Sequence, residues 1–517
     1  MSRMHDLFVD PAHLRCHSGA CLIAQRARSI STGARGVYTG ASEAVNTNRV
    51  VRCIALLLLS LRAEVWAAAP ESQRPPNFVV IFCDDLGYGD LGSFGAKTIR
   101  TPHLDRMAQQ GQRWSQFYVG ASVCTPSRAA LMTGRLPIRS GMCSSRRRVL
   151  FPNSKGGLPQ TEVTIAEALK QRDYVTACVG KWHLGHLPEF LPTAHGFDSY
   201  YGIPYSNDMG LTPQPKGKKR LAYYAANRAV DLDYWGRVPL MEGAKIIERP
   251  VDQTSLTRRY TERAVQFIQA NRQRPFYHYL AHNKPHVPLF RSEKFRNVSA
   301  GGVYGDVIQE IDWAVGQVLD TIRTAGLEKN TVVVFTSDNG PWLWFRDHGG
   351  SSGPLRGGKG GTFEGGMREP TVIWGPGIVQ PGEVAELGAT MDLLPTFCAL
   401  AGIAAPADRT LDGHDLSGVL MGTGKSPRQT VFYYLGTEVW AVRHGNYKMH
   451  LKTVEPAYGE GKTVTAHDPP LLFDLSVDIG ERKNVAAEHA EVLAELTALV
   501  VAHRASIKSV PSQLEIR

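Results

Sequence analysis

Short, unbroken runs of apolar residues recur along the middle of this chain, and segments with helical spacing of apolar positions separate them. The run Asn77–Cys83 is rich in β-branched residues, which is typical of a strand buried on both faces of a parallel sheet. The other predicted elements are strands at 174–180, 274–281 and 331–336, and helices from about Thr101, over 164–170 and over about 307–325. The alternation predicts an α/β fold with a large, mostly parallel mixed sheet flanked by helices.

The pattern changes after about Thr423. Short apolar runs separated by turns predict strands at 430–434, 440–443, 447–451 and 471–475. The segment 486–506 has the spacing of an amphipathic helix, so we expect a small antiparallel sheet with one helix. The chain thus divides into three predicted parts: an N-terminal extension with a signal peptide over 1–70, an α/β domain over 71–423 and an α+β subdomain over 424–517.

The N-terminal part contains one strongly apolar run, Cys53–Leu61. Arg49 and Arg52 precede it, and the small residues 67–69 follow it, which is the layout of a signal peptide. A run this short does not span a bilayer, so we expect no stable membrane span. The alternative is a buried helix of the folded domain. The signal-peptide interpretation predicts an exported protein, either periplasmic or secreted.

Composition narrows the functional classes. The chain has 517 residues, 43% apolar and 21% charged, which is ordinary for a soluble globular enzyme. The formal net charge of +10 suits an anionic substrate, but it also fits ordinary solubility. No basic helix or RNA-binding aromatic motif indicates a nucleic-acid partner. Eight cysteines without a C-x-x-C pair argue against zinc ribbons and thioredoxin-like motifs.

The most informative motif is Cys124-Thr-Pro-Ser-Arg128, which leads directly into a helical run. Pro126 fits the first turn of a helix, where its missing N–H has no cost. Cys124 would then lie at the helix start, where free N–H groups and the helix dipole favour an anion. Arg128 is four residues on and would share the same helix face. The alternative for Cys124 is a small buried apolar residue.

Polar residues also follow three of the predicted strands, where α/β sheets collect ligands. They are Asp84-Asp85, Lys181 with His183 two residues later, and Asp338-Asn339. Carboxylate and amide oxygens suit Ca²⁺ or Mg²⁺ and disfavour zinc. Adjacent acidic residues after one strand are also common as loop or cap residues. The pairing of two such motifs favours a metal site.

The motif C-T-P-S-R-A-A-L-M-T-G-R resembles the signature of the sulfatase family, which belongs to the alkaline-phosphatase superfamily. The resemblance extends from about Pro76 to about Ala486 and is closest to the arylsulfatase A and N-acetylgalactosamine-6-sulfatase group. It implies a sulfuric ester hydrolase that cleaves sulfate monoesters of a sugar or an aryl alcohol. It also implies that a formylglycine-generating enzyme converts Cys124 to formylglycine, an aldehyde.

The resemblance implies a role for each matching residue. One Ca²⁺ would be held by Asp84, Asp85, Asp338, Asn339 and the converted Cys124. Catalytic positions would be Cys124, Arg128, Lys181, His183, His286 and Lys359, with Ser206, Lys181, His286 and Lys359 touching substrate. A hydroxyl of hydrated formylglycine would attack sulfur with help from Asp338 and the metal. His286 would protonate the leaving alcohol, and His183 would take the proton of the second hydroxyl.

Two other functions stay open at this point. A phosphonate or phosphodiester hydrolase of the same superfamily uses the same cysteine signature. A catalytically silent, glycan-binding homologue would result if Cys124 stayed unconverted. The natural substrate is also open, because the arginines 146–148 could meet a carboxylate or a second sulfate, or could form a solvated loop.

Overall fold

The computed structural model describes residues 74–209, 238–458 and 461–517. The predicted signal peptide and the region of its cleavage lie outside these ranges. In the part of the chain that is described, no helix is long and apolar enough to cross a membrane.

A large mixed sheet runs through the described part of the chain, with the strand order β10-β2-β9-β8-β1-β7-β3-β4-β5-β6 and with β11 beside β2. Its central strands β8, β1, β7 and β3 are all parallel to one another. Antiparallel pairs occur where β9 joins β8 and β2, and along β4, β5 and β6. The predicted mostly parallel mixed sheet is therefore confirmed. The strands are β1 (Asn77–Asp84), β2 (Gln112–Tyr118), β3 (Val175–Gly180), β4 (Ser199–Gly202), β5 (Leu240–Glu242), β6 (Lys245–Glu248), β7 (Phe276–Pro285), β8 (Thr331–Ser337), β9 (Arg368–Trp374), β10 (Gly382–Val384) and β11 (Gly388–Ala389).

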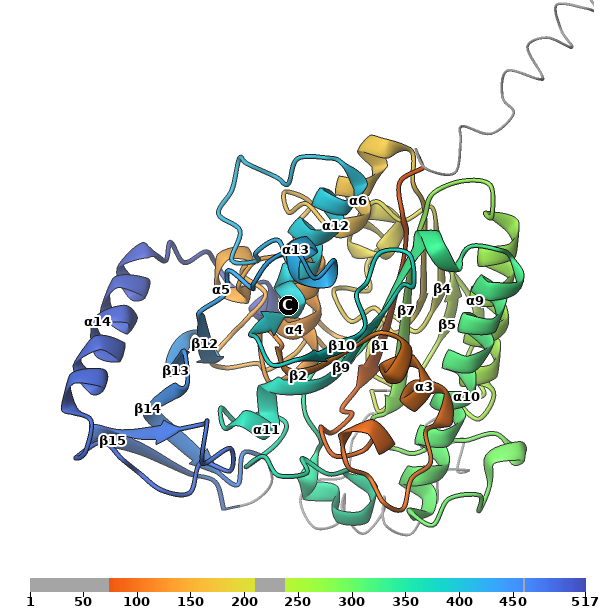
Figure 1. Ribbon diagram of the computed structural model, residues 1–517. Helices are drawn as coiled ribbons and strands as arrows, with labels where there is room; N and C mark the ends of the chain where they lie inside the picture. The colour runs from red at the N-terminus through yellow and green to blue at the C-terminus, as the bar shows by residue number, and fades with distance from the viewer. Residues whose placement is uncertain (1–73, 210–237, 459–460) are drawn as a thin grey trace, which may run out of the picture. The chain divides into compact units, whose positions relative to one another are not determined.

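Helices cover both faces of this sheet (Figure 1). Alternate residues of β1 point to opposite faces, as strand geometry requires. Val79 and Ile81 pack with α3, α9 and α10, whereas Phe78 and Val80 pack with α4, α6 and α12. Burial on both faces explains why β1 is apolar from Phe78 to Cys83. These helices are α3 (Pro102–Gln110), α4 (Cys124–Thr133), α6 (Ile165–Leu169), α9 (Leu256–Ala270), α10 (Gly302–Thr324) and α12 (Leu393–Ala401), and the shorter ones are α5 (Pro137–Ser140), α11 (Glu364–Met367) and α13 (Ser417–Leu420).

A second sheet near the C-terminus has four antiparallel strands in chain order, and α14 packs on β13 and β14 (Figure 1). This confirms the predicted small sheet with one helix. The helix begins at Ala490 rather than at 486, because Val485 donates a backbone hydrogen bond to Leu472 and is held against β15. The predicted boundary between residues 423 and 424 stays a prediction. The elements are β12 (Thr430–Leu435), β13 (Glu438–His444), β14 (Tyr447–Glu455), β15 (Thr463–Asp474) and α14 (Ala490–Ser506).

A buried ionic network joins this second sheet to the glycine-rich segment before β9. Glu364, the first residue of α11, accepts hydrogen bonds from Lys448 at 2.9 Å and from Tyr433 at 2.6 Å. Glu481 accepts from Lys448 at 2.9 Å and from the backbone N–H of Glu364 at 2.6 Å. Burial opposes ionisation of Glu364, but Lys448 and Arg443 outweigh it and hold its pKa well below the usual range.

Replacing Lys448 tests how strongly the network holds the two parts together. Lys448→Met leaves Glu364 and Glu481 short of a buried cation, so we expect the free energy of unfolding to fall by about 3–5 kcal/mol. Lys452→Met is the matched control, because Lys452 lies on the same strand but pairs with Glu438 at the surface. It should cost no more than about 1 kcal/mol. Urea unfolding of both variants decides, and equal losses would contradict a special role for Lys448.

Candidate active site

Polar residues from four adjacent parallel strands meet at one edge of the large sheet. Asp84 ends β1, Lys181 follows β3, His286 follows β7 and Asp338 follows β8. The carboxyl ends of parallel strands lie together, which is where α/β sheets bind ligands. The structure thus brings together side chains that are far apart in the sequence.

Lys181 reaches the centre of this group because of a close turn at the end of β3. Gly180 has a φ of +113°, and a Cβ at this position would lie 1.8 Å from the carbonyl oxygen of Ala281, so only glycine fits. The Lys181 Nζ then lies 2.6 Å from Asp84 Oδ2 and 3.4 Å from Ser206 Oγ. Burial opposes ionisation of Asp84, but Lys181 and the other nearby cations outweigh it and hold its pKa well below the usual range.

Cys124 is the first residue of α4, as predicted, and all ten residues of this helix are buried. Its Sγ lies 3.3 Å from Asp84 Oδ1. Arg128, one turn later, donates from Nε to Asp338 Oδ2 at 2.9 Å, and its Nη2 lies 3.8 Å from Asp84 Oδ1. The prediction that Cys124 and Arg128 share a helix face is therefore confirmed. Burial and the charge of Asp84 raise the pKa of the Cys124 thiol well above its usual value, so the thiol is protonated despite the helix dipole.

Asp85 is the second carboxylate of the group and has a left-handed backbone conformation, with φ of +65°. Lys359 Nζ lies 2.6 and 2.8 Å from its two oxygens, and Asn339 Nδ2 donates to Oδ1 at 2.7 Å. His286 Nε2 lies 3.6 Å from Asp85 Oδ2. Lys359 also lies 3.5 Å from the Cys124 Sγ, so it contacts both the carboxylate and the thiol.

His183 lies beside the other predicted residues but has its own contacts. Its Nε2 is 2.9 Å from the carbonyl oxygen of Leu150, and its buried Nδ1 has no hydrogen-bond partner. Thr125 donates to the His183 carbonyl oxygen at 3.0 Å and ties the histidine to α4. Burial and the charge of Lys181 lower the pKa of His183 well below its usual value, so the imidazole is neutral.

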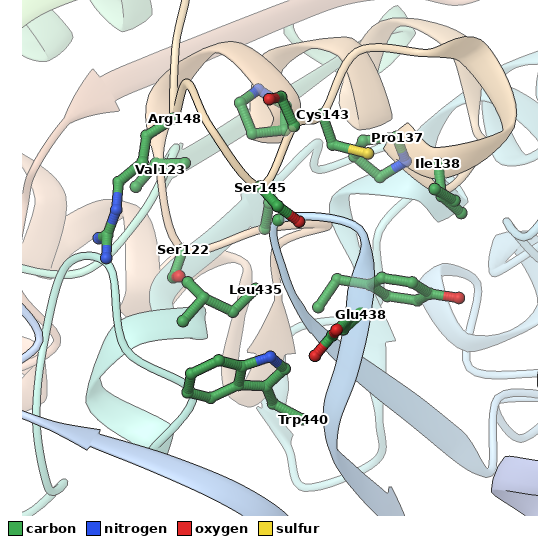
Figure 2. Close-up of a pocket in the computed structure, with 15 residues that line it drawn as sticks. Ser122, Val123, Pro137, Ile138, Cys143, Ser145, Arg148, Leu435, Glu438 and Trp440 are labelled. Carbon is green, nitrogen blue, oxygen red and sulfur yellow. The ribbon is translucent and has the colours of Figure 1, made fainter. Parts of the chain in front are cut away.

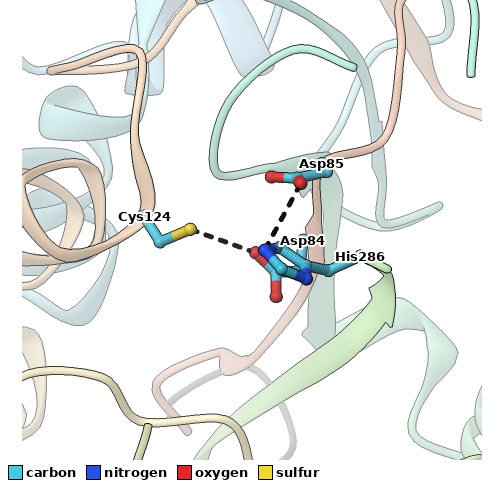
Figure 3. A group of neighbouring side chains, drawn as sticks. All are labelled: Asp84, Asp85, Cys124 and His286. Carbon is cyan, nitrogen blue, oxygen red and sulfur yellow. Dashed lines mark hydrogen bonds and ion pairs between the residues drawn. The ribbon is translucent and has the colours of Figure 1, made fainter. Parts of the chain in front are cut away.

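Four side chains form a compact set of potential metal ligands (Figure 3). One atom from each of Asp84, Asp85, Cys124 and His286 lies within 4.8 Å of the others, and all four residues are buried. The sequence placed Asp338 and Asn339 in this set and His286 outside it. In the structure Asp338 is bound to Arg128, and the buried Oδ1 of Asn339 has no hydrogen-bond partner.

Two aromatic residues at the site were not foreseen from the sequence. The ring of Trp342 lies 4.5 Å from Lys359 Nζ and 5.3 Å from the ring of His286, measured to ring centroids. The Tyr279 hydroxyl accepts a hydrogen bond from Arg128 at 3.4 Å. Trp342 follows the Asp338-Asn339 pair within four residues, and that closeness was the available signal.

Comparison with known protein families shows to which family this chain belongs. The family model described as Sulfatase matches residues 76–403, and the model described as the C-terminal region of aryl-sulfatase matches residues 426–517. The chain belongs to the sulfatase family. It is accordingly a sulfuric ester hydrolase, and the resemblance inferred from the cysteine motif is confirmed.

Relatives of this sulfatase align over most of its length. Human arylsulfatase A is 45% identical over 469 residues, which cover 86% of this chain and 89% of the relative. Mouse N-acetylgalactosamine-6-sulfatase is 39% identical over 496 residues, covering 89% of this chain and 91% of the relative. The crystal structure of the PsFucS1 sulfatase from Pseudoalteromonas sp. superposes with a TM-score of 0.73 at 29% identity, covering 84% of this chain and 90% of that one.

The sulfatase site suits a hard cation by its charges and its donors. The carboxylates Asp84, Asp85 and Asp338 carry oxygen donors of the kind a hard cation prefers, and the buried Oδ1 of Asn339, which has no hydrogen-bond partner, is another. Three cationic side chains, Lys181, Lys359 and Arg128, balance the three carboxylates, so an added divalent cation makes the cluster net positive. A net positive cluster suits an anionic sulfate ester.

Proposed function

We propose that this sulfatase hydrolyses sulfate monoesters of a sugar or an aryl alcohol, with a formylglycine made from Cys124 and one bound Ca²⁺. The observation that carries the proposal is the convergence of Asp84 and Lys359 on the Cys124 side chain, at 3.3 and 3.5 Å from Sγ. A nucleophile at this point would have both a carboxylate and an ammonium group in close contact.

A formylglycine at position 124 fits these surroundings better than the encoded thiol. The raised pKa of Cys124 leaves little thiolate, and the thiolate is the nucleophilic form. Attack by a thiol would also leave a sulfated cysteine without a second hydroxyl to expel the sulfate. The hydrate of formylglycine supplies two hydroxyls, one to attack sulfur and one to release the sulfate. The proposed maturation partner is a formylglycine-generating enzyme.

The remaining site residues have complementary proposed roles. Bound Ca²⁺ would supply electrostatic stabilisation, with Asp84, Asp85, Asp338, Asn339 and the residue at 124 as its ligands. Lys181, Lys359 and Arg128 stabilise negative charge on the sulfuryl oxygens. Asp338 accepts the proton of the attacking hydroxyl, His286 donates one to the leaving alcohol, and Ser206, next to Lys181, touches the substrate. His183, neutral and with a free Nδ1, accepts the proton of the second hydroxyl.

The proposal is tested by one comparison of substrates. Protein made together with a formylglycine-generating enzyme should hydrolyse p-nitrophenyl sulfate and sulfated sugars. Its kcat/KM for a matched aryl phosphonate monoester, which carries the same single negative charge, should be lower by at least about 100-fold, because a carbon substituent replaces one of the oxygens that the cationic side chains would hold. A preference for the phosphonate, or binding of sulfated glycans without turnover, would support one of the two alternative functions.

Export is the proposed localisation, and it predicts where the mature chain begins. The apolar run Cys53–Leu61 followed by small residues should be removed by a signal peptidase, leaving an N-terminus between Ala67 and Gln73. N-terminal sequencing of exported protein measures this position directly. An exported chain that still begins at Met1 would contradict the signal-peptide interpretation.

A further inference from the structure

The three consecutive arginines Arg146, Arg147 and Arg148 have different surroundings. Arg146 exposes 86% of its side chain and lies 3.5 Å from Glu515. Arg147 donates hydrogen bonds within its own loop and to the backbone of the C-terminal tail. Arg148 is half-buried, and its Nη1 donates to the carbonyl oxygen of Gly360 at 3.3 Å. Only Arg148 therefore reaches the segment that carries Lys359.

Gly360 places Arg148 close to the site of sulfate chemistry. It directly follows Lys359, whose Nζ lies 3.5 Å from the Cys124 Sγ, and consecutive Cα atoms are ~3.8 Å apart. A Cβ on Gly360 would lie 2.3 Å from Arg148 Nη1 and 2.5 Å from the ring of Tyr458. The missing side chain lets the guanidinium and the ring close over the backbone, with the guanidinium 4.5 Å from the ring centroid.

A second cationic side chain, that of Lys462, lies near the ring of Tyr458. Lys462 Nζ is 5.1 Å from the centroid of Tyr458, and burial together with the charge of Arg148 lowers the pKa of Lys462. In the described ranges, neither Arg148 nor Lys462 forms an ion pair with a carboxylate. Two neighbouring cations repel each other, and an anion bound between them removes that cost.

Space for a sugar adjoins Arg148. Arg148 lines a cavity of about 250 Å³ together with Ser122 and Val123, which directly precede Cys124 in the sequence (Figure 2). Trp440 from the second sheet forms another wall. An aromatic ring and a few polar groups around a small cavity are typical of a site that orients a ligand.

We propose that Arg148, together with Lys462, binds a second anionic group of the substrate, a sulfate or a carboxylate on the sulfated sugar or on its neighbour. The pair would select polyanionic glycans over neutral monosulfated ones. This specificity rests on the proposed sulfatase function and adds to it a substrate class. Arg148 acts in binding, whereas the sulfuryl group is held by Lys181 and Lys359.

The experiment compares three substrates built on one disaccharide: monosulfated and otherwise neutral, disulfated, and monosulfated with a uronic acid. The measured quantity is the ratio of kcat/KM for each dianionic substrate to that for the neutral one. Arg148→Ala should lower this ratio by roughly 10- to 100-fold, mainly through KM, as expected for losing a charged hydrogen bond. Lys462→Met should lower it less, because the lysine is more exposed.

Arg146→Ala is the matched control, since it removes the same charge from the same loop without touching Tyr458. It should leave the ratio within about twofold of the unmodified enzyme. Comparing the disulfated and uronic acid substrates shows which anion the pair prefers. If the unmodified enzyme is active but its ratio is near one, the second-anion site alone is overturned. The same follows if Arg146→Ala lowers the ratio as much as Arg148→Ala does. An enzyme inactive on every sulfate ester would overturn the proposed function and this site with it.

Discussion

Cys124→Ser should abolish sulfate ester hydrolysis, with kcat falling by roughly 10⁴-fold or more. A serine hydroxyl at this position can be sulfated, but it has no second hydroxyl with which to expel the sulfate. The variant should therefore transfer at most one sulfate group to the serine of each active site and then stop. Steady-state rates, together with mass spectrometry of the peptide that carries residue 124, measure both effects.

The same experiment separates a chemical loss from a folding loss. Serine and cysteine are close in size, so the free energy of unfolding of Cys124→Ser should lie within about 1 kcal/mol of that of the unmodified protein. Cys398→Ala is the matched control, because Cys398 is another buried free thiol but lies in α12. It should retain activity. Full activity in protein whose Cys124 is entirely unmodified thiol would disprove the formylglycine mechanism.

Removal of divalent cations should lower activity by at least about 100-fold, and Ca²⁺ should restore it. Lys181 and Lys359 each lie 2.6 Å from a carboxylate oxygen, of Asp84 and Asp85 respectively. A cation held by these carboxylates would compensate their charge and leave both ammonium groups available to the sulfate. Chelation with EGTA, followed by addition of Ca²⁺ or Zn²⁺ and elemental analysis of the dialysed enzyme, measures the requirement. Thermal unfolding should shift upward with Ca²⁺, because the ion binds only the folded chain.

Two variants define the ligand set more closely. Asp338→Ala should lose more activity than Asn339→Ala, because Asp338 is also the proposed base and is the ion-pair partner of Arg128. Asn339→Ala removes one neutral oxygen and should mainly weaken Ca²⁺ binding. Stoichiometric zinc in active enzyme would contradict the Ca²⁺ assignment. It would point instead to His286 and the other ligands of the compact set.

The central strands could be predicted because they are buried on both faces and so carry unbroken apolar runs. β2 was not predicted, since Gln112–Tyr118 mixes polar and aromatic residues in a strand with partly exposed positions. The extent of β15 was also missed, because its first half is mostly exposed and Pro469 and Pro470 follow that half directly. Strands with exposed positions contain polar residues, and they therefore lack the continuous apolar run on which the prediction depends.

The sequence predicted those site residues that lie at strand ends or in a recognisable motif, but it did not predict the contacts between them. The sequence located Asp84, Lys181 and Asp338 at strand ends, but not that Lys181 binds Asp84, because such pairing depends on strand order. The network around Glu364 was missed for a related reason. Lys448 and His450 alternate with apolar residues on β14, which normally indicates an exposed face, yet both are completely buried. Their burial is explained by Glu364, which pairs with Lys448, and by Glu481, which pairs with both residues.

The burial of α4 bears on whether Cys124 can be modified before or after the chain folds. Cys124 is only 2% exposed, and its neighbours on the helix are equally enclosed. An enzyme that oxidises this side chain must hold the surrounding peptide in its own cleft, which the folded chain does not allow. The proposed conversion to formylglycine would therefore precede closure of the domain, while the segment is still extended. A batch of protein folded in a host without the converting enzyme should stay inactive when that enzyme is added later, and should respond only if it is unfolded and refolded in its presence.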